Sequence, residues 1–312
     1  MVRPGTQAVT VASLSPAALA ERLAGPGLYL RTGPFINHIV ADNAAIAHGI
    51  GLMYGDYPLA ESAEFADFHL GFDDSTGWRR WWRPQVRFSN DGERPFAPLP
   101  REQGYAMFEW MLNWCVSSRA HDYLIIHAAV VEKDGCAAIL PAPPGSGKST
   151  LCTALVHRGW RLLSDELALI RLADGEIVPL PRPISLKNAS IGIMRGYLDA
   201  PVFSQPADYT HKGTVAHLRA PADSVARAGE TARPAWVVFP QYAAGEAAVL
   251  APVPRARAFM QLADNAFNFS LLGADGFNAL AGVIARSEAY TFRYSVLDEA
   301  IDVFAGLAPG QT

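Results

Sequence analysis

Residues 141–150 read Pro-Ala-Pro-Pro-Gly-Ser-Gly-Lys-Ser-Thr, which is the composition and spacing of a phosphate-binding loop. Gly145 and Gly147 allow backbone N–H groups to close around phosphate oxygens, and Lys148 can reach the outer phosphates. Ser149 is then the expected ligand of a magnesium ion. We therefore predict that nucleotide phosphates are bound by Gly145, Ser146, Gly147, Lys148, Ser149 and Thr150.

The loop departs from the usual pattern at one position. Ala142 stands where the first glycine is expected, so the loop entry lacks the residue that best tolerates a positive φ. An ordinary turn would explain the glycines, but it would not explain the Lys-Ser-Thr sequence that opens an apolar segment after them. Phosphate binding is therefore the better interpretation.

Two adjacent carboxylates, Asp165 and Glu166, follow the loop inside residues 159–170, which have the pattern of a buried strand. Successive side chains of a strand point to opposite faces, so only one of the two can face the phosphates unless the strand ends there. We expect one carboxylate to hold magnesium and the other to accept a proton from an attacking hydroxyl. The alternative is an acidic pair that is merely solvated at the end of a strand.

His127 interrupts an apolar run over residues 123–131. A lone histidine in such a strand is more often a core residue than a catalytic one. A turn at residues 132–135 nevertheless predicts a hairpin with residues 136–140, which would place His127 near the phosphates and beside Asp165. Because burial disfavours the charged imidazole, we expect a neutral ring that tunes the carboxylate and does not carry phosphate.

Residues 179–188 are rich in proline and predict an extended, exposed path. Arg182 and Lys187 in this segment could stabilise transferred phosphoryl oxygens, although an ordinary surface loop is an equal alternative. Further candidates for nucleotide or substrate contacts flank a helix-like segment and are Arg255, Arg257, Asn265 and Asn268.

The elements around these residues predict an α/β protein. The loop lies between a strand-like segment, 136–140, and a helix-like segment, 151–157, which is the context that the motif needs. Before them the pattern predicts a helix over 15–23, an antiparallel module over 28–96 and a linking helix over 100–118, and after them a strand over 289–295 followed by a helix. We predict a smaller N-terminal α+β module with its linking helix at 1–120 and a nucleotide-binding domain at 121–312.

Residues 78–88 interleave arginines with aromatic residues. Such a stretch could grip an anionic partner. It could equally be an edge strand with solvated arginines and packed tryptophans, which Pro84 favours.

Composition is typical of an ordinary enzyme. Half of the 312 residues are hydrophobic and the net charge is −4, which speaks against general binding of nucleic acid. No apolar run approaches the ~18 residues of a membrane span, and the N-terminus lacks a signal core, so we expect a cytoplasmic protein without a membrane partner. Cys115, Cys136 and Cys152 have no metal-binding spacing and are expected to be reduced core thiols.

Several stretches of the chain resemble a known family. His127, the loop at 142–149 and the pair Asp165-Glu166 resemble the catalytic core of the bacterial HPr kinase/phosphorylases. More closely, four strings are similar to the HPr-kinase-related kinase A family, and the resemblance covers most of the chain: EWMLNWC at 109–115, LIIHAAV at 124–130, GWRLLSDE at 159–166 and PRPISLKN at 181–188.

The resemblance implies a P-loop nucleotide-binding core with a mixed sheet of the HPr-kinase or PEP-carboxykinase-like type. It further implies a kinase that uses ATP and Mg²⁺ to transfer the γ-phosphoryl group to a hydroxyl, of a Ser or Thr in a protein or peptide. Lys148 and Ser149 would bind phosphate and metal, Asp165 would be the base, Glu166 a metal ligand where the family has aspartate, and His127 the neighbour of Asp165. A homo-oligomer is also implied.

Two other functions remain open. A small molecule or a glycan could be the hydroxyl acceptor, or the chain could be a nucleotide-gated interaction protein that transfers no phosphate.

Overall fold

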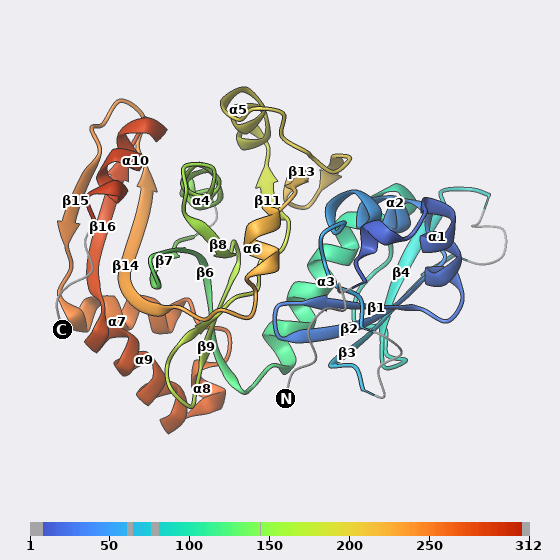
Figure 1. Cartoon of the computed structure of the whole chain (residues 1–312), viewed down its shortest axis with the longest axis horizontal. Helices are drawn as coiled ribbons and strands as arrows, with labels where there is room; N and C mark the ends of the chain where they lie inside the picture. The colour runs from blue at the N-terminus through green and yellow to red at the C-terminus, as the bar shows by residue number, and fades with distance from the viewer. Residues whose placement is uncertain (1–8, 61–64, 76–80, 144, 308–312) are drawn as a thin grey trace.

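The computed structural model describes residues 9–60, 65–75, 81–143 and 145–307 of the chain. Helices and mixed β-sheets alternate along these residues, so the predicted α/β class is confirmed (Figure 1). The strands form three sheets.

The first sheet has the order β1-β2-β3-β4-β5, with β1 (Leu28–Thr32), β2 (Phe35–Ala41), β3 (Phe68–Asp74), β4 (Gln85–Asn90) and β5 (Leu99–Pro100). The helices that precede or interrupt it are η1 (Val11–Ser13), α1 (Pro16–Ala24) and α2 (Ala44–Met53). As predicted, Ser15 caps α1 and accepts a hydrogen bond from the Ala18 N–H at 3.2 Å.

The prediction of a wholly antiparallel N-terminal module is wrong at one place. Strands β2 and β3 are parallel, whereas their other neighbours pair antiparallel. A tight turn cannot join parallel strands, and α2 provides the crossover between them.

The stretch of arginines and aromatic residues is only partly described, because residues 78–80 lie outside the described residues. The remainder leads into β4, which pairs with β3 on one side and, at its first residues, with β5 on the other. The expected edge strand is therefore wrong at this end of β4. Trp81 and Trp82 are 83% and 67% exposed, so the expectation that these two tryptophans are buried by packing is wrong.

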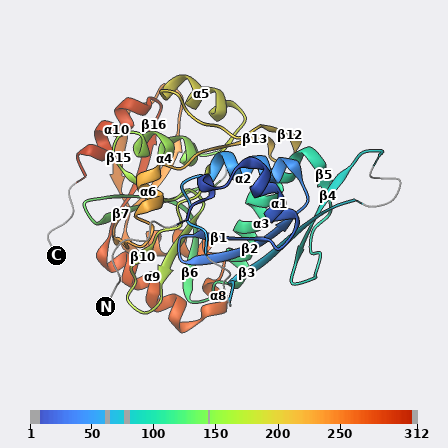
Figure 2. The ribbon, with the colours of Figure 1, turned by 45° about the vertical axis from the view of Figure 1, so that its right-hand side comes forward.

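The predicted linking helix is present as η3 (Arg101–Gln103) and α3 (Gly104–Arg119). Figure 1 shows α3 between the first sheet and the rest of the molecule. Most of the α3 side chains are buried, and they belong to one apolar core that also contains residues of the second sheet. Figure 2 shows β4 and β5 at the opposite end of the molecule from β15 (Val249–Pro252) and α10 (Leu297–Ala305).

The second sheet has the order β10-β9-β6-β7-β14-β16-β15, and β8 pairs with β6 beside β9. Its strands are β6 (Tyr123–Lys133), β7 (Cys136–Pro141), β8 (Arg161–Ser164), β9 (Leu167–Arg171), β10 (Ile177–Val178), β14 (Arg233–Tyr242), β15 and β16 (Glu288–Tyr294). The sheet is mixed, because β14 is parallel to both β7 and β16 while the other pairs are antiparallel.

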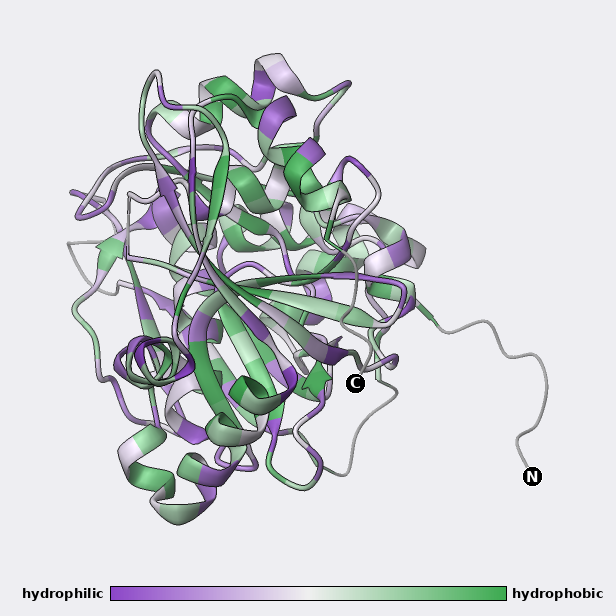
Figure 3. Ribbon diagram, turned by 90° about the vertical axis from the view of Figure 1, so that its left-hand side faces the viewer, coloured by the Kyte–Doolittle hydropathy of each residue, from purple (hydrophilic) through white to green (hydrophobic). Residues whose placement is uncertain are grey.

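Helices cover both faces of the second sheet, which explains its long apolar strands (Figures 1 and 3). Alternate residues of β6 face the two sides: Leu124 and Ile126 pack in a core with α7 (Arg255–Asp264) and α9 (Ala274–Arg286). Ile125 and Ala129 pack in the other core with α4 (Lys148–Val156) and α10. This alternation places His127 on the α4 side of the sheet. The short helix α8 (Phe269–Leu272) lies between α7 and α9 in the chain.

The third sheet is small and antiparallel, with the order β11-β13-β12. Its strands are β11 (Ile184–Lys187), β12 (Ala207–Thr210) and β13 (Gly213–Leu218), and the neighbouring helices are α5 (Ala189–Tyr197) and α6 (Ala222–Ala226). Its strand β11 lies within the proline-rich segment 179–188, which follows Asp165 and Glu166 in the chain.

Two predictions from composition can be compared with the fold. Cys115, Cys136 and Cys152 are buried and unpaired, as expected. Within the described ranges, no helix has the length and hydropathy that crossing a membrane requires.

Candidate functional site

The predicted loop joins β7 to α4, and two of its glycines have a positive φ. Gly145 and Gly147 have φ values of +88° and +85°, which side chains other than glycine rarely adopt. Gly147 is the N-cap of α4, so Lys148 is the first residue of the helix. Ala142 is buried and has a negative φ, so the alanine at this position causes no backbone strain.

Two tyrosines from the neighbouring parallel strands hold this loop. The hydroxyl of Tyr294 donates to the Gly147 carbonyl at 3.0 Å, and the Tyr242 backbone N–H donates to the Ser146 carbonyl at 3.0 Å. A Cβ atom added at Gly147 would lie 2.5 Å from the Tyr294 oxygen. Gly147 is therefore required by its φ and also by the close approach of Tyr294.

Lys148 points its ammonium group into the protein interior. The residue is 7% exposed, and its Nζ atom has no hydrogen-bond partner among the described residues. Burial lowers the pKa of this lysine, although Glu166 and Asp165 act in the opposite direction. A buried cation without a partner is costly, so the geometry suits an anion delivered from outside the chain. The Ser146 hydroxyl is likewise buried without a partner in the described structure.

The two carboxylates lie where the predicted strand over 159–170 breaks. The structure divides it into β8 and β9, with Asp165 and Glu166 in the bend between them. The expectation of one continuous strand is thus corrected, and the reason is that β8 and β9 pair with separate parts of β6. Because the strand ends there, the period of two no longer forces the two side chains apart.

Asp165 is the buried member of the pair. It is 3% exposed and accepts a hydrogen bond from the Ser185 N–H at 2.8 Å. Burial, with a further contribution from the charge of Glu166, raises the pKa of Asp165 to about 7. At neutral pH this carboxyl group can therefore both accept and release a proton.

Glu166 has the opposite character. Its side chain is 18% exposed, accepts a hydrogen bond from Asn113 Nδ2 at 3.1 Å, and has Lys187 Nζ 3.8 Å from Oε1. Burial alone would raise the pKa of Glu166, but the charges of Lys187, Lys148 and Lys212 outweigh it and lower the pKa. Glu166 is therefore ionised and suits a magnesium ligand.

His127 lies close to the carboxylates in the sheet, because it pairs with Leu167 of β9, two residues after Asp165. Burial, followed by the charge of Lys148, lowers the pKa of His127 to about 4, so the ring is neutral as anticipated. The charge of Glu166 acts in the opposite direction and raises the pKa of this ring. No hydrogen bond joins the His127 ring to Asp165 in the described part of the chain, and Asp165 is influenced instead by Glu166, Arg182 and Lys148. The expected hydrogen bond between the His127 ring and Asp165 is therefore not formed among the described residues, whereas the tuning of Asp165 by His127 stays a prediction.

The proline-rich segment is buried and not exposed, which corrects a second expectation. Its strand β11 pairs with β13, and the Tyr57 hydroxyl donates to the Pro181 carbonyl at 3.0 Å. Arg182 is only 4% exposed; its Nη2 donates to Asn113 Oδ1, while Nη1 is buried without a partner among the described residues. The structure thus brings Arg182 and Lys187 to the carboxylates.

Of the four candidates near α7, Asn265 contacts the site through its backbone, because its carbonyl accepts a hydrogen bond from the His127 N–H at 2.8 Å. Asn268 uses both ends of its amide on β6, accepting from the Ile125 N–H and donating to the Tyr123 carbonyl. Asn265 donates to the Gln261 carbonyl. The remaining two, Arg255 and Arg257, are exposed on α7, which covers the face of the sheet opposite to α4 (Figure 1).

Two residues of the site escaped the sequence reasoning. Asn113 comes from α3 and lies in the string 109–115 that carried the family resemblance, so a signal was present there. Lys212 lies in the turn between β12 and β13, with its Nζ 5.4 Å from the centre of the Trp110 ring. Burial lowers the pKa of Lys212, which Glu166 partly counteracts. No motif marks this lysine in the sequence.

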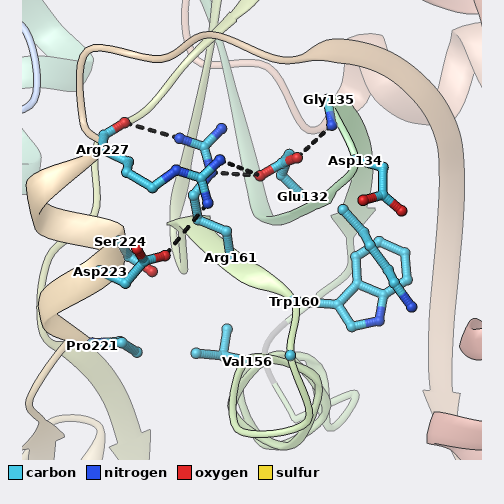
Figure 4. Close-up of a pocket in the computed structure, with 12 residues that line it drawn as sticks. Glu132, Asp134, Gly135, Val156, Trp160, Arg161, Pro221, Asp223, Ser224 and Arg227 are labelled. Carbon is cyan, nitrogen blue, oxygen red and sulfur yellow. Dashed lines mark hydrogen bonds and ion pairs between the residues drawn. The ribbon is translucent and has the colours of Figure 1, made fainter.

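A separate pocket of about 390 Å³ lies at the far end of the β6–β7 hairpin, away from the glycine loop (Figure 4). Ion pairs join four of its charged side chains, Glu132, Arg161, Asp223 and Arg227. Arg161 forms a buried ion pair with Glu132 at 2.5 Å and donates to the carbonyls of Arg227 and Glu230. These ion pairs offset the charges of the groups that they join, whereas Lys148 has no hydrogen-bond partner among the described residues.

The donor set of the site fits Mg²⁺ held jointly with phosphate. Across the described ranges, no group of three or more His, Cys, Asp or Glu side chains could hold a metal by itself. Magnesium usually binds to one or two carboxylates together with substrate phosphates and water. Glu166 and the half-buried Ser149 could supply such a partial set.

Comparisons with known proteins add no assignment to this geometry. No protein-family model matches the chain, and no curated protein matches it significantly.

Proposed function

We propose that the protein is a kinase that uses ATP and Mg²⁺ to transfer the γ-phosphoryl group to the hydroxyl of a Ser or Thr in a protein or peptide. The observation that carries the proposal is the buried ammonium of Lys148 at the first turn of α4, beside Asp165 and Glu166, with no hydrogen-bond partner in the part of the chain that the structure describes. A cation in this position is stabilised by the phosphates of a nucleotide.

Each side chain has a role that follows from its surroundings. Lys148 and the loop N–H groups bind the phosphates. Asp165, with its pKa of about 7, accepts the proton of the attacking hydroxyl, whereas the ionised Glu166 and Ser149 would hold the metal. Bound Mg²⁺ would supply positive charge to the β- and γ-phosphate oxygens. Arg182 adds positive charge near the carboxylates, and its Nη1 atom is buried without a hydrogen-bond partner among the described residues.

We also propose the finer fold assignment that the family resemblance implies, namely a P-loop core of the HPr-kinase or PEP-carboxykinase-like type. The order of strand, glycine loop and helix supports it, and so does the mixed sheet that surrounds β7.

The test is a screen of candidate acceptors with ATP and Mg²⁺, read by intact mass. A gain of one phosphoryl group on a protein or peptide supports the proposal, and a gain on a small molecule or glycan identifies the other kind of kinase. Lys148→Ala should abolish the gain, whereas Lys133→Ala, at the far end of the β6–β7 hairpin, should not. Equal transfer by both variants would refute the assignment of the loop.

A nucleotide-gated interaction protein is a second candidate, because Asn113 connects the N-terminal module to Glu166. Such a protein would make at most ADP and inorganic phosphate, with no phosphorylated acceptor.

A further inference from the structure

Asn113 joins two charged groups of the site although it belongs to α3. Its Oδ1 accepts from Arg182 Nη2, and its Nδ2 donates to Glu166 Oε2 at 3.1 Å. We infer that Asn113 is a positioning residue that orients Glu166 for the metal, so that the N-terminal part of the chain completes the site. The inference rests on the proposed function.

The chemistry of the two neighbours determines the orientation of the amide. A guanidinium group can only donate hydrogen bonds, so the side of Asn113 that faces Arg182 must be the carbonyl oxygen. The NH₂ group is thereby directed at Glu166, whose ionised carboxylate only accepts. Neither aspartate nor leucine can satisfy both neighbours at once, although both have nearly the size of asparagine.

The hydrogen bond from Asn113 selects one oxygen of Glu166. Oε2 is held by the amide, whereas Oε1 lies toward Lys187 at 3.8 Å. Without the amide, the flexible glutamate could turn toward the lysines that surround it. Outer partners of this kind commonly determine how well a carboxylate binds its metal.

Helix α3 is itself held in a defined rotation. Glu109 lies one helical turn before Asn113 and therefore on the same face. Its buried carboxylate accepts hydrogen bonds from the hydroxyls of Tyr54, at 2.7 Å, and Tyr105, at 2.6 Å. The Tyr105 bond lies within α3, whereas the Tyr54 bond comes from the end of α2 and holds the Glu109 side of α3 against the N-terminal module.

The test compares Asn113→Leu and Asn113→Asp with the wild type. Calorimetry measures ATP affinity with and without Mg²⁺, and turnover measures the half-saturating Mg²⁺ concentration. Asn113→Leu should raise that concentration by about 10- to 100-fold while ATP affinity without Mg²⁺ is unchanged. Asn113→Asp keeps the acceptor for Arg182 but places a second carboxylate beside Glu166, so it should bind Mg²⁺ more tightly and lower the concentration.

A matched control is Asp56→Asn, which removes the 2.6 Å ion pair between Asp56 of the N-terminal module and Arg219, away from the carboxylates. It should leave the Mg²⁺ dependence unchanged. The role of Asn113 would be overturned if Asn113→Leu and Asn113→Asp shifted the half-saturating Mg²⁺ concentration in the same direction. It would also be overturned if neither shift were larger than that of Asp56→Asn. If the wild type itself shows no Mg²⁺-dependent binding or turnover of ATP, the proposed function fails instead.

Discussion

At the scale of single residues, burial disfavours the charged form of both Lys148 and Asp165, so it lowers the pKa of the lysine and raises the pKa of the aspartate. Lys148 keeps an ammonium group in the interior without a hydrogen-bond partner among the described residues. Asp165 sits in a bend where burial favours the protonated acid. Both arrangements oppose stability in the absence of ligand and suit phosphate transfer in its presence.

Replacing Lys148 with methionine should therefore separate stability from binding. Without ATP, Lys148→Met should unfold at a higher temperature than the wild type, because an unpaired buried charge costs about 1–3 kcal/mol. With ATP it should gain no further stability, because the phosphates lose their cation. Thermal unfolding with and without ATP measures both effects. Lys133→Met is the control, and a destabilised Lys148→Met that still responds to ATP would contradict the prediction.

Asp165 should govern the pH dependence of the reaction. Since the base must be ionised, kcat/KM should rise with pH through about 7, and Asp165→Asn should remove this rise and lower the rate by about 10²- to 10⁴-fold.

The same carboxyl group should also affect folding. Its native pKa lies above the value of about 4 in the unfolded chain, so the native state binds the extra proton between these values. Stability from this group is present below about pH 4 and is lost as the pH rises to about 7. Urea unfolding at a series of pH values measures the free energy of unfolding. Between about pH 4 and 7 this free energy should decline less in Asp165→Asn than in the exposed control Asp174→Asn. If the free energy of unfolding depended on pH equally in the two variants, the raised pKa of Asp165 would be refuted.

At the scale of elements, the site depends on the glycine loop between β7 and α4, which is supported from outside. Tyr294 at the end of β16 and Tyr242 at the end of β14 both bond to its carbonyls. The neighbouring strand ends thus hold the loop in shape, as expected at the carboxyl edge of parallel strands.

Gly147→Ala should be more harmful than a comparable substitution elsewhere. The new Cβ would meet the Tyr294 oxygen at 2.5 Å, in addition to the strain of a positive φ. Gly135→Ala has a similar φ of +77° with nothing within 4 Å of its Cβ, so it reports the backbone strain alone. We expect Gly147→Ala to lose clearly more stability, by chemical unfolding, and to weaken ATP binding, which Gly135→Ala should retain. If the two variants lost equal stability, the close contact between the new Cβ atom and Tyr294 would be ruled out as a cause.

Local elements could be predicted from the sequence, whereas distant pairings could not. The β6–β7 hairpin follows from its turn, where Asp134 and Gly135 both have positive φ as a two-residue hairpin demands. The burial of Arg182 could not be foreseen, because it depends on the pairing of β11 with β13, about 30 residues farther along. The contact of Asn113 with Glu166 likewise spans 53 residues and leaves no local periodicity.

At the scale of the whole molecule, one apolar core extends from the first sheet through α3 into the second and third sheets. Buried polar contacts cross the same boundary, such as the hydrogen bond from the Tyr57 hydroxyl to the Pro181 carbonyl. The two predicted domains therefore share packing, and their stabilities should be coupled.

We expect the intact chain to unfold in a single transition. The calorimetric and van't Hoff enthalpies should agree, because neither part can open without exposing the shared core. Tyr57→Phe should lower the midpoint, by about 1 kcal/mol of stability, without dividing the transition. Two separate transitions, in the wild type or in the variant, would show that the parts fold independently.

The hydrogen bond between Tyr294 and Gly147 spans 147 residues, and it has a consequence for the order in which the protein is synthesised. The ribosome releases the glycine loop and Lys148 long before it releases β14 and β16. During that interval the loop lacks the two tyrosines that hold its carbonyls, so a nascent chain has the motif without the proposed nucleotide site. Under the proposed function, fragments that end before β16 should therefore bind nucleotide poorly, and binding should begin only after this strand has been translated.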